Sequence, residues 1–385
     1  MEKQRIMVFL KAAYLYLESF FLRLKKKKDI LFVVINRTMF SYVRPIYERL
    51  KEDKRLRLWF LFYRPERFKP EDLEQIKRKY FLKTVNKFMA NYFKWDLVVY
   101  PDHGFNVRKD CLKIYVGHGA GGGGKAFEAG ESYVYGSRSK NIKGEIIYSK
   151  IFVGSENELA RVKRCYPEFH SRVRVVGNLL LDEMDKYISL KSEIFKDAGL
   201  DFSRKTVMIV STWGSDSLIQ SFGLEMIKKI PKLAEKYNVV LTIHHNNYVK
   251  EYSGGIDWEQ KLKAIEHKNV FVLYERRDPF FLLANADILI SDITSLSLYF
   301  PHLLRPMILL YNSDIKCEKE NIFEKTKANA YLINNVDNLE TDIEKAFSQF
   351  DKAKMFSFAQ SIFSYQGQAW KRYKAELYDS LSLDV

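Results

Sequence analysis

Residues 206–247 read TVMIVSTWGSDSLIQSFGLEMIKKIPKLAEKYNVVLTIHHNN, and this stretch decides the fold class. It contains two short apolar, β-branched runs, at 206–211 and 239–244, on either side of an amphipathic helical pattern. Strand, helix and strand in this order predict two parallel strands joined by a crossover helix. Polar residues follow both strands directly, at the sheet edge where parallel sheets bind their ligands.

The same alternation extends in both directions from this stretch. The other predicted strands lie at 30–35, 57–63, 97–100, 113–117, 150–155, 173–177, 270–274, 286–291 and 306–311. Two consecutive α/β units, each doubly wound, are the simplest account, and they would face a central cleft. The predicted domains are an N-terminal unit at 29–190, a C-terminal unit at 191–336, and helices at 337–385 that cross back over the first unit.

Charge and composition limit the choice of partners. Among 385 residues, Lys and Arg number 63 and Asp and Glu 48, so the formal net charge is +15. Such a charge attracts nucleic acid, an anionic membrane or a polyanionic substrate. The 47% hydrophobic fraction excludes a disordered basic tail. The three cysteines, Cys111, Cys165 and Cys317, lack metal-ligand or redox spacing, which excludes a disulfide scaffold and favours a cytoplasmic setting.

The N-terminal residues 1–28 predict an amphipathic helix that associates with a membrane. Residues 7–24 are apolar and aromatic, but Lys11 and Glu18 interrupt them, so the segment is too charged to span a bilayer. Lysines at 25–28 follow it and could contact anionic headgroups. A helix packed on its own domain is the alternative.

A second basic and aromatic stretch covers residues 64–95. Its aromatic side chains, interleaved with Lys and Arg, could stack on nucleotide bases. Helical spacing instead favours ordinary core packing for five apolar residues, Leu73, Ile76, Phe81, Val85 and Phe88. Because no helix-turn-helix, zinc-finger or RNP-type pattern is present, we expect no nucleic-acid partner.

Four short motifs follow predicted strands and carry the candidate chemistry. They are GHGAGGGGK at 117–125, STWG at 211–214, IHHNN at 243–247 and SDITS at 291–295. A glycine run lets the backbone approach an anion, and a histidine beside it can exchange protons near neutral pH. Hydroxyl groups and free N–H groups at the start of a helix can also form a phosphate-binding site. A flexible surface loop and simple helix capping remain the alternatives for these motifs.

In this order and spacing the motifs resemble the CDP-glycerol glycerophosphotransferase family, whose teichoic-acid and capsule enzymes have a GT-B architecture. The family's tryptophan-histidine-glycine-threonine loop is matched by residues 117–120, and its valine-threonine-glycine segment by VVGNLLLD at 175–182. Its proline-threonine-tryptophan-arginine strand end is matched by 211–214, its histidine-proline pair by 244–245, and its threonine-aspartate-tyrosine-serine-serine turn by 291–295. Gly214 and His245 depart from the family's arginine and proline, and the tryptophan before the histidine is replaced by Gly117.

The resemblance implies transfer of a polyol phosphate from CDP-glycerol, or another CDP-polyol, to an acceptor hydroxyl, with CMP leaving. It implies that His118 is the general base and that His244 shares the catalytic role by holding the pyrophosphate. The implied donor- and phosphate-binding residues are Gly119, Thr212, Trp213, His245, Ser291, Asp292, Thr294 and Ser295. Asp292 fits a helix cap or an orienting group better than a direct phosphate ligand.

The expected setting is the inner face of the cell membrane, with a lipid-linked or polyanionic polymer as acceptor. No cofactor or metal ion is expected, because the histidines lack carboxylates at ligand spacing. Two other functions stay open from the sequence. One is a GT-B glycosyltransferase that uses a nucleotide sugar, and the other is a non-catalytic basic module that binds an anionic polymer.

Overall fold

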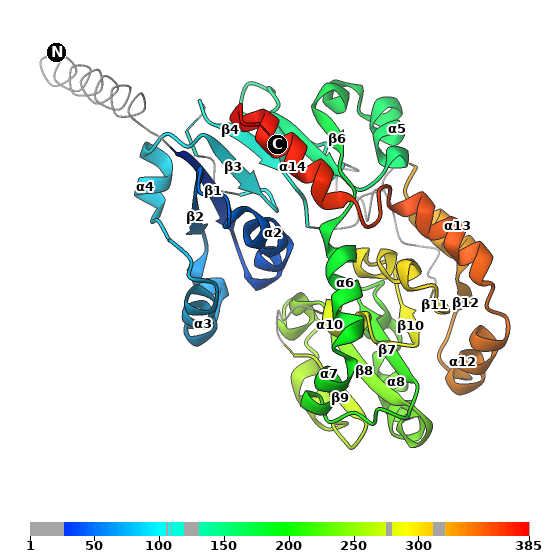
Figure 1. Ribbon diagram of the computed structural model, residues 1–385. Coiled ribbons are helices and arrows are strands. Elements are labelled where there is room, and N and C mark those ends of the chain that lie inside the picture. The colour runs from blue at the N-terminus through cyan, green and yellow to red at the C-terminus, as the bar shows by residue number, and fades with distance from the viewer. Residues whose placement is uncertain are drawn as a thin grey trace, which may run out of the picture. The chain divides into compact units, whose positions relative to one another are not determined.

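The structure, a computed structural model, describes residues 27–104, 107–108, 110–118, 131–274, 279–310 and 320–384 (Figure 1). Two six-stranded sheets, with strand orders β2-β1-β3-β4-β5-β6 and β12-β11-β10-β7-β8-β9, form its framework. Within both sheets the strand pairs that the structure describes are parallel. The α/β class predicted from the sequence is therefore confirmed, whereas a central cleft between the sheets stays a prediction.

The strands of the first sheet are β1 (Lys28–Val34), β2 (Leu56–Phe62), β3 (Leu97–Tyr100), β4 (Leu112–Tyr115), β5 (Lys150–Val153) and β6 (Val173–Val175). Those of the second sheet are β7 (Thr206–Ser211), β8 (Asn238–Ile243), β9 (Val270–Val272), β10 (Ile288–Ser291), β11 (Met307–Leu310) and β12 (Tyr331–Ile333). All eleven strands predicted from the sequence are present, with ends shifted by a few residues at most. Strand β12 was not predicted, because a three-residue strand is too short to show periodicity.

The α-helices are α2 (Arg37–Leu50), α3 (Pro70–Tyr80), α4 (Lys87–Tyr92), α5 (Glu156–Cys165), α6 (Leu179–Ser189), α7 (Lys191–Asp197), α8 (Leu218–Lys236), α9 (Trp258–Lys263), α10 (Phe280–Leu283), α11 (Phe323–Asn329), α12 (Leu339–Ser348), α13 (Lys352–Ile362) and α14 (Ala369–Leu381). Short 3₁₀ helices include η4 (His245–Tyr248), η5 (Ser295–Leu298) and η6 (Phe300–Leu303). In the described ranges no helix has both the length and the apolar character needed to cross a membrane. The predicted N-terminal helix lies outside the described residues except for Lys27 and Lys28.

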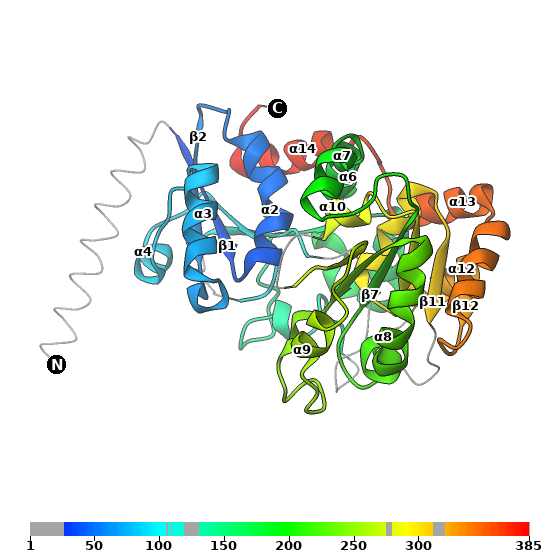
Figure 2. The same cartoon turned by 90° about the horizontal axis from the view of Figure 1, so that it is seen from below.

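Local sequence explains why α8 begins and packs where it does. Ser217 is its N-cap, and its hydroxyl group accepts from the backbone N–H of Gln220. The helix buries an apolar face at a helical period, with Ile219, Met226 and Ile230 all fully buried. This face packs on the second sheet, whose strands are buried along their whole length in β7, β8, β10 and β11 (Figure 2).

The basic and aromatic stretch departs from the predicted packing in part. Leu73, Ile76 and Val85 are buried, as the helical spacing indicated. Phe81 and Phe88 instead face solvent, with 87% and 67% of their surfaces exposed. The core prediction was wrong for these two residues because α3 ends at Tyr80, so the helical period does not continue through them.

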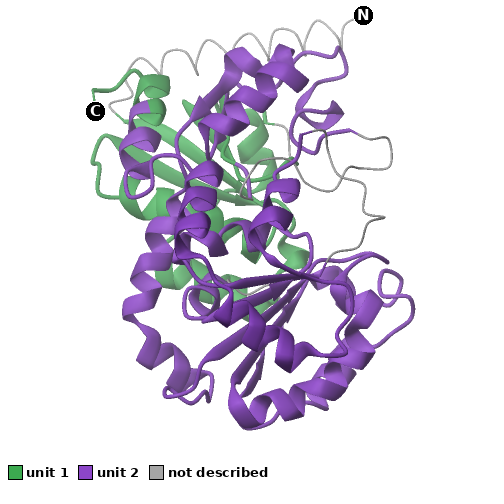
Figure 3. Ribbon diagram, turned by 90° about the vertical axis from the view of Figure 1, so that its right-hand side faces the viewer, with its two compact units in different colours: residues 1–116, 376–385 green, residues 117–375 purple. Residues whose placement is uncertain are grey.

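The chain divides into two compact units, residues 1–116 with 376–385, and residues 117–375 (Figure 3). The first unit contains β1 to β4 together with the last residues of α14. Tyr378 of α14 donates a hydrogen bond of 2.6 Å to Asp53, whose carboxylate also receives the Arg55 guanidinium. Those bonds to Arg55 and Tyr378 hold the pKa of Asp53 below its usual range. The domain boundaries inferred from the sequence stay predictions.

Within the second unit, the segment between α13 and α14 packs against the ends of β5 and β6. The Ser364 backbone N–H donates to the Gly154 carbonyl over 2.9 Å, and its hydroxyl accepts from the Glu156 backbone. Gly177, just after β6, has a φ of +77°, and a Cβ placed on it would lie 2.8 Å from the Ser364 carbonyl oxygen. Glycine is therefore required there both for backbone conformation and for space.

We expect Gly177→Ala to destabilise the protein by about 2–4 kcal/mol, because the added methyl group collides with backbone and also strains φ. Gly199→Ala is the matched control, since Gly199 has a φ of +66° with nothing within 4 Å of its added Cβ. That control should cost only about 1 kcal/mol. Urea unfolding followed by circular dichroism measures both, and equal losses would show that the contact with Ser364 contributes nothing.

Candidate active site

Three of the four sequence motifs lie at the carboxyl ends of neighbouring strands. STWG follows β7, IHHNN follows β8 and SDITS follows β10, and the order of these strands in the sheet is β10-β7-β8. Their ends are level, because Ser211 pairs in register with Ile243 and Ser291 with Val210. The structure therefore brings the three motifs to one sheet edge, the place where ligands bind parallel sheets.

Asp292 joins two of these strand ends to the start of α8. Its side chain is 1% exposed, and its oxygens accept from the backbone N–H of Thr212 at 2.9 and 3.0 Å and of Leu218 at 2.8 Å. The Ser211 hydroxyl lies 2.9 Å from the same carboxylate. These hydrogen bonds fix the backbone of both turns around the carboxylate. The roles predicted for Asp292, as a helix cap or orienting group and as a donor-binding residue, stay predictions.

The first turn of α8 is satisfied by protein atoms. Leu218 donates to Asp292, Ile219 to the Ser211 hydroxyl over 2.9 Å, and Gln220 to Ser217. The positive end of this helix therefore stabilises the Asp292 carboxylate. A phosphate group at this sheet edge would therefore have to be bound by groups other than these N–H groups.

His244 begins the turn after β8 and carries a fixed tautomer when neutral. Its Nδ1 accepts from the Asn246 backbone N–H at 3.2 Å, and its own backbone N–H donates to the Ser211 carbonyl over 2.9 Å. An Nδ1 that accepts leaves the proton on Nε2, so Nε2 can donate to an anion. The ring stacks on Trp213 at 5.9 Å between centroids and makes a tilted contact with His245 at 4.1 Å.

Thr212 and Trp213 lie between these groups. The Thr212 carbonyl accepts from the buried Asn247 side chain at 2.9 Å, which fixes the backbone after β7. Trp213 is 42% exposed and makes an edge contact with Tyr252 at 6.0 Å. Its exposed indole, braced by His244 and Tyr252, is available to a planar ligand group.

The SDITS turn presents hydroxyl groups after β10. Ser291 is fully buried and its hydroxyl donates to the Asp292 carbonyl over 2.9 Å. Thr294 is the N-cap of η5 and is half-buried, and Ser295 beside it is exposed. Of these hydroxyl groups, those of Thr294 and Ser295 are the ones that a ligand could reach.

His118 lies apart from this cluster in the chain, after β4, and Gly119 falls outside the described residues. The His118 ring contacts the Tyr133 ring edge-on, with 5.4 Å between the ring centroids. The Arg138 guanidinium lies over the same Tyr133 ring, 4.9 Å from its centroid. The imidazole therefore packs against an aromatic ring that also carries a cation.

Several residues that shape these strand ends were given no role from the sequence. Asn247, inside the IHHNN motif, and Ser217 hold the backbone around β7, and Tyr133 contacts His118. His103 follows β3 and stacks on Tyr115 at 4.8 Å. Only Ser217 gave a usable signal, because a serine ahead of a helical pattern is a typical N-cap. The others depend on contacts between residues distant in sequence.

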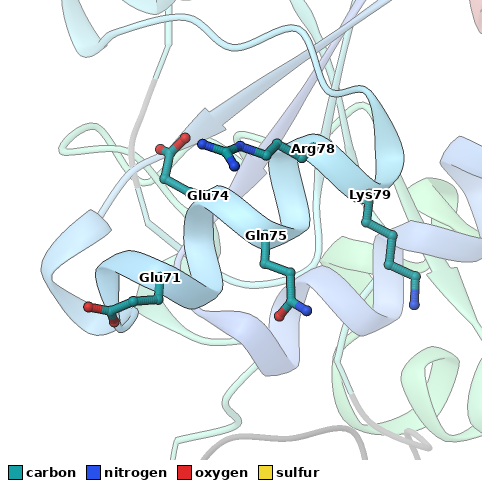
Figure 4. Close-up of a pocket in the computed structure, with 5 residues that line it drawn as sticks. All are labelled: Glu71, Glu74, Gln75, Arg78 and Lys79. Carbon is teal, nitrogen blue, oxygen red and sulfur yellow. The ribbon is translucent and has the colours of Figure 1, made fainter.

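A hollow of about 420 Å³ opens elsewhere, on α3, and Glu71, Glu74, Gln75, Arg78 and Lys79 line it (Figure 4). All of its lining residues come from one exposed helix, and none belongs to the strand ends. Within the described ranges, no three His, Cys, Asp or Glu side chains gather as metal ligands would.

A family model described as CDP-glycerol:poly(glycerophosphate) glycerophosphotransferase matches residues 15–372. The chain belongs to this glycerophosphotransferase family. It is thus a transferase that uses CDP-glycerol, and the family and enzyme class inferred from the motifs are confirmed. A search of curated proteins gives no match for this glycerophosphotransferase.

Solved structures confirm the fold of the glycerophosphotransferase. The wall teichoic acid polymerase TagF is similar over 93% of this chain and 90% of its own, with a TM-score of 0.65 and 15% identity. The UDP-GlcNAc 2-epimerase from Neisseria meningitidis, bound to UDP-GlcNAc, is similar over 92% and 99%, with a TM-score of 0.55 and 14% identity.

We expect Asp292→Asn to destabilise the glycerophosphotransferase by about 2–4 kcal/mol, because an amide turns one acceptor into a donor that faces backbone N–H groups. Asp287→Asn is the matched control at the other end of β10, where the half-buried carboxylate accepts one hydrogen bond, from Thr206. It should cost about 1 kcal/mol. Chemical unfolding measures both, and an equal or smaller loss for Asp292→Asn would contradict its role as the link between strand ends.

Proposed function

We propose that this glycerophosphotransferase transfers glycerol phosphate from CDP-glycerol to a hydroxyl group of a lipid-linked or polymeric acceptor and releases CMP. One observation carries the proposal. His244, Thr294 and Ser295 follow the ends of neighbouring strands and lie on the same sheet edge. Asp292 fixes the backbone at this edge by accepting from the Thr212 N–H. Phosphoryl transfer requires positioning and donor groups more than covalent help from the protein, and this edge supplies both.

His118 is proposed as the general base. Its imidazole takes the proton of the acceptor hydroxyl while the acceptor oxygen attacks the phosphorus that bears glycerol. The bond from this phosphorus to the bridging oxygen breaks, and CMP leaves with the electron pair. Tyr133 supports the proposal because its ring limits the orientations that the His118 ring can adopt.

His244, Thr294 and Ser295 are proposed to hold the pyrophosphate. The Nε2–H of His244 and the two hydroxyl groups donate to oxygens on which negative charge builds as the bridging bond breaks. Trp213, Thr212 and His245 complete the donor site, with the exposed indole beside the cytosine or ribose. Gly119 and Ser291 belong to the same proposed donor site.

The proposed product is a teichoic acid-like or capsular polymer. The fold shared with the polymerase TagF supports this product class. A net charge of +15 supports it as well, because a basic surface attracts both a lipid-linked polyanion and its growing chain. The proposed location is the cytoplasmic face of the cell membrane, with residues 1–28 in contact with anionic lipid.

We propose that the transfer needs no cofactor and no metal ion. The His244 Nε2–H and the Thr294 and Ser295 hydroxyl groups supply the hydrogen-bond donors in place of the divalent cation that other phosphotransferases use. CMP release that stops in EDTA and returns with Mg²⁺ would overturn this part of the proposal and leave the transfer reaction intact.

His118→Gln should lower the rate of CMP release from CDP-glycerol at least about 100-fold, because the acceptor proton loses its base. His267→Gln is the control, since His267 is an exposed histidine that the site does not use. Chromatography of CMP, with an oligomeric glycerol phosphate acceptor, measures both rates. Normal CMP release by His118→Gln would remove His118 from the mechanism.

A donor comparison tests the substrate class. CDP-glycerol, CDP-ribitol and UDP-N-acetylglucosamine are offered separately with the same acceptor, and nucleotide release is measured. We expect turnover with the CDP-polyols alone. Turnover only with the nucleotide sugar would instead support a GT-B glycosyltransferase, and acceptor binding without any turnover would support a non-catalytic polymer-binding module.

A further inference from the structure

The stretch from Gln75 to Trp95 has an unusual surface for a soluble unit. It contains six basic residues and no acidic residue, and the basic residues are Lys77, Arg78, Lys79, Lys83, Lys87 and Lys94. It also exposes four aromatic side chains, Phe81 at 87%, Phe88 at 67%, Tyr92 at 51% and Phe93 at 45%. Ile76, Val85 and Trp95 are buried side chains that supply core contacts of this segment. The exposed aromatic rings therefore do not serve the packing of the unit.

The backbone that carries these rings is held firmly against the edge of the first sheet. Thr84 forms a parallel bridge with Phe60 of β2, the edge strand, through hydrogen bonds of 2.8 and 2.9 Å. Phe81 comes three residues before this bridge, and α4 begins three residues after it. Figures 1 and 2 show α3 and α4 together on the β2 side of the sheet. The exposed rings are thus presented from a fixed edge.

Phe81 occupies a position where glycine is the preferred residue. It caps α3 in the left-handed region, with a φ of 53° and a ψ of 45°, and its N–H donates to the Arg78 carbonyl. Glycine adopts this conformation freely, whereas an aromatic residue is strained in it. Because Phe81 is strained and 87% exposed, glycine at this position would stabilise the protein at least as well. Backbone strain of this kind is typical of functional positions.

The other rings form two local pairs beside basic side chains. Phe88 and Tyr92 lie 4.4 Å apart on α4, and Phe93 lies 6.2 Å from the buried Trp95. Lys83 lies over the Trp59 ring at 5.9 Å, and Trp59 in turn contacts Trp95. Aromatic and basic residues are therefore interleaved along this segment, a composition by which proteins insert into the headgroup region of a bilayer.

We propose that Phe81, Phe88, Tyr92 and Phe93, with the lysines around them, form a lipid-contact surface for the anionic leaflet. It rests on the proposed membrane location of the enzyme, but it concerns residues 77–94 and not residues 1–28. A single-stranded nucleic acid would need a basic groove that follows its backbone. The hollow on α3 is lined by two glutamates, Glu71 and Glu74, beside Arg78 and Lys79, so it is not such a basic groove, and the exposed aromatic rings fit a lipid surface better (Figure 4).

Phe81→Gly separates lipid contact from a structural role. Glycine relieves the left-handed strain, so the melting temperature should rise by about 1–3 °C. Removal of the ring should at the same time weaken binding of the full chain to vesicles made of equal parts phosphatidylcholine and phosphatidylglycerol. Sedimentation with vesicles measures the binding. Unchanged binding together with higher stability would overturn the proposal for Phe81.

The double variant Phe81→Ser/Phe88→Ser tests the surface as a whole, and we expect at least about a 10-fold loss of vesicle binding. Lys83→Gln/Lys87→Gln should lose about five-fold per charge, and only with phosphatidylglycerol present. Phe202→Ser is the matched control, because Phe202 is 59% exposed in the other unit. Equal losses for Phe202→Ser and the double variant would overturn the proposal, as would tighter binding to single-stranded DNA than to vesicles.

The proposed reaction can fail independently of this surface. With a water-soluble oligomeric acceptor, the double variant should release CMP at the rate of the unaltered enzyme, whereas His118→Gln should not. If replacement of Lys25 to Lys28 by glutamine abolishes vesicle binding and the double variant does not, the N-terminal segment is the whole anchor and the proposed surface is wrong.

Discussion

One buried carboxylate organises the candidate active site. Asp292 lies in the turn after β10, and its carboxylate accepts hydrogen bonds from backbone N–H groups at the end of β7 and the start of α8. Two strand ends and a helix terminus therefore share one acceptor. Because a buried carboxylate without its donors is costly, the three elements are held in a single arrangement. The turns that carry Thr212, Trp213, Thr294 and Ser295 all extend from this point.

This constraint also decides where positive potential is available. The N-terminus of α8 would by itself attract a phosphate, but Asp292 and the hydroxyls of Ser211 and Ser217 occupy its first N–H groups. Negative charge on a donor must then meet side chains of the neighbouring turns. His244 is suited to this because its Nδ1 accepts from the Asn246 backbone N–H, which leaves the proton of the neutral ring on Nε2. The N-terminus of α8 thus stabilises the Asp292 carboxylate, and the turn after β8 supplies the histidine proposed to bind the ligand.

The sequence predicts the sheets well, because β-branched runs between amphipathic helices leave few alternatives to parallel strands. The motifs gave the family for a similar reason, since residues that follow strands meet at one edge. The Asp292 contacts could not be foreseen in detail, as its partners at Ser211 and Thr212 lie 81 and 80 positions earlier in the chain. Phe81 was misplaced because a helical period was extended past the end of α3, where a left-handed residue reverses the chain. Local patterns therefore predict elements, while their ends depend on contacts that no short window contains.

The return of α14 has a consequence for biosynthesis. Residues 376–385 belong to the same compact unit as β1 to β4, although they are translated only after the whole of the other unit. Tyr378 reaches Asp53 across 325 positions. The first unit therefore lacks these contacts until residues 376–385 have been made, so strictly sequential N-to-C folding, the usual order for domains, leaves it incomplete until then.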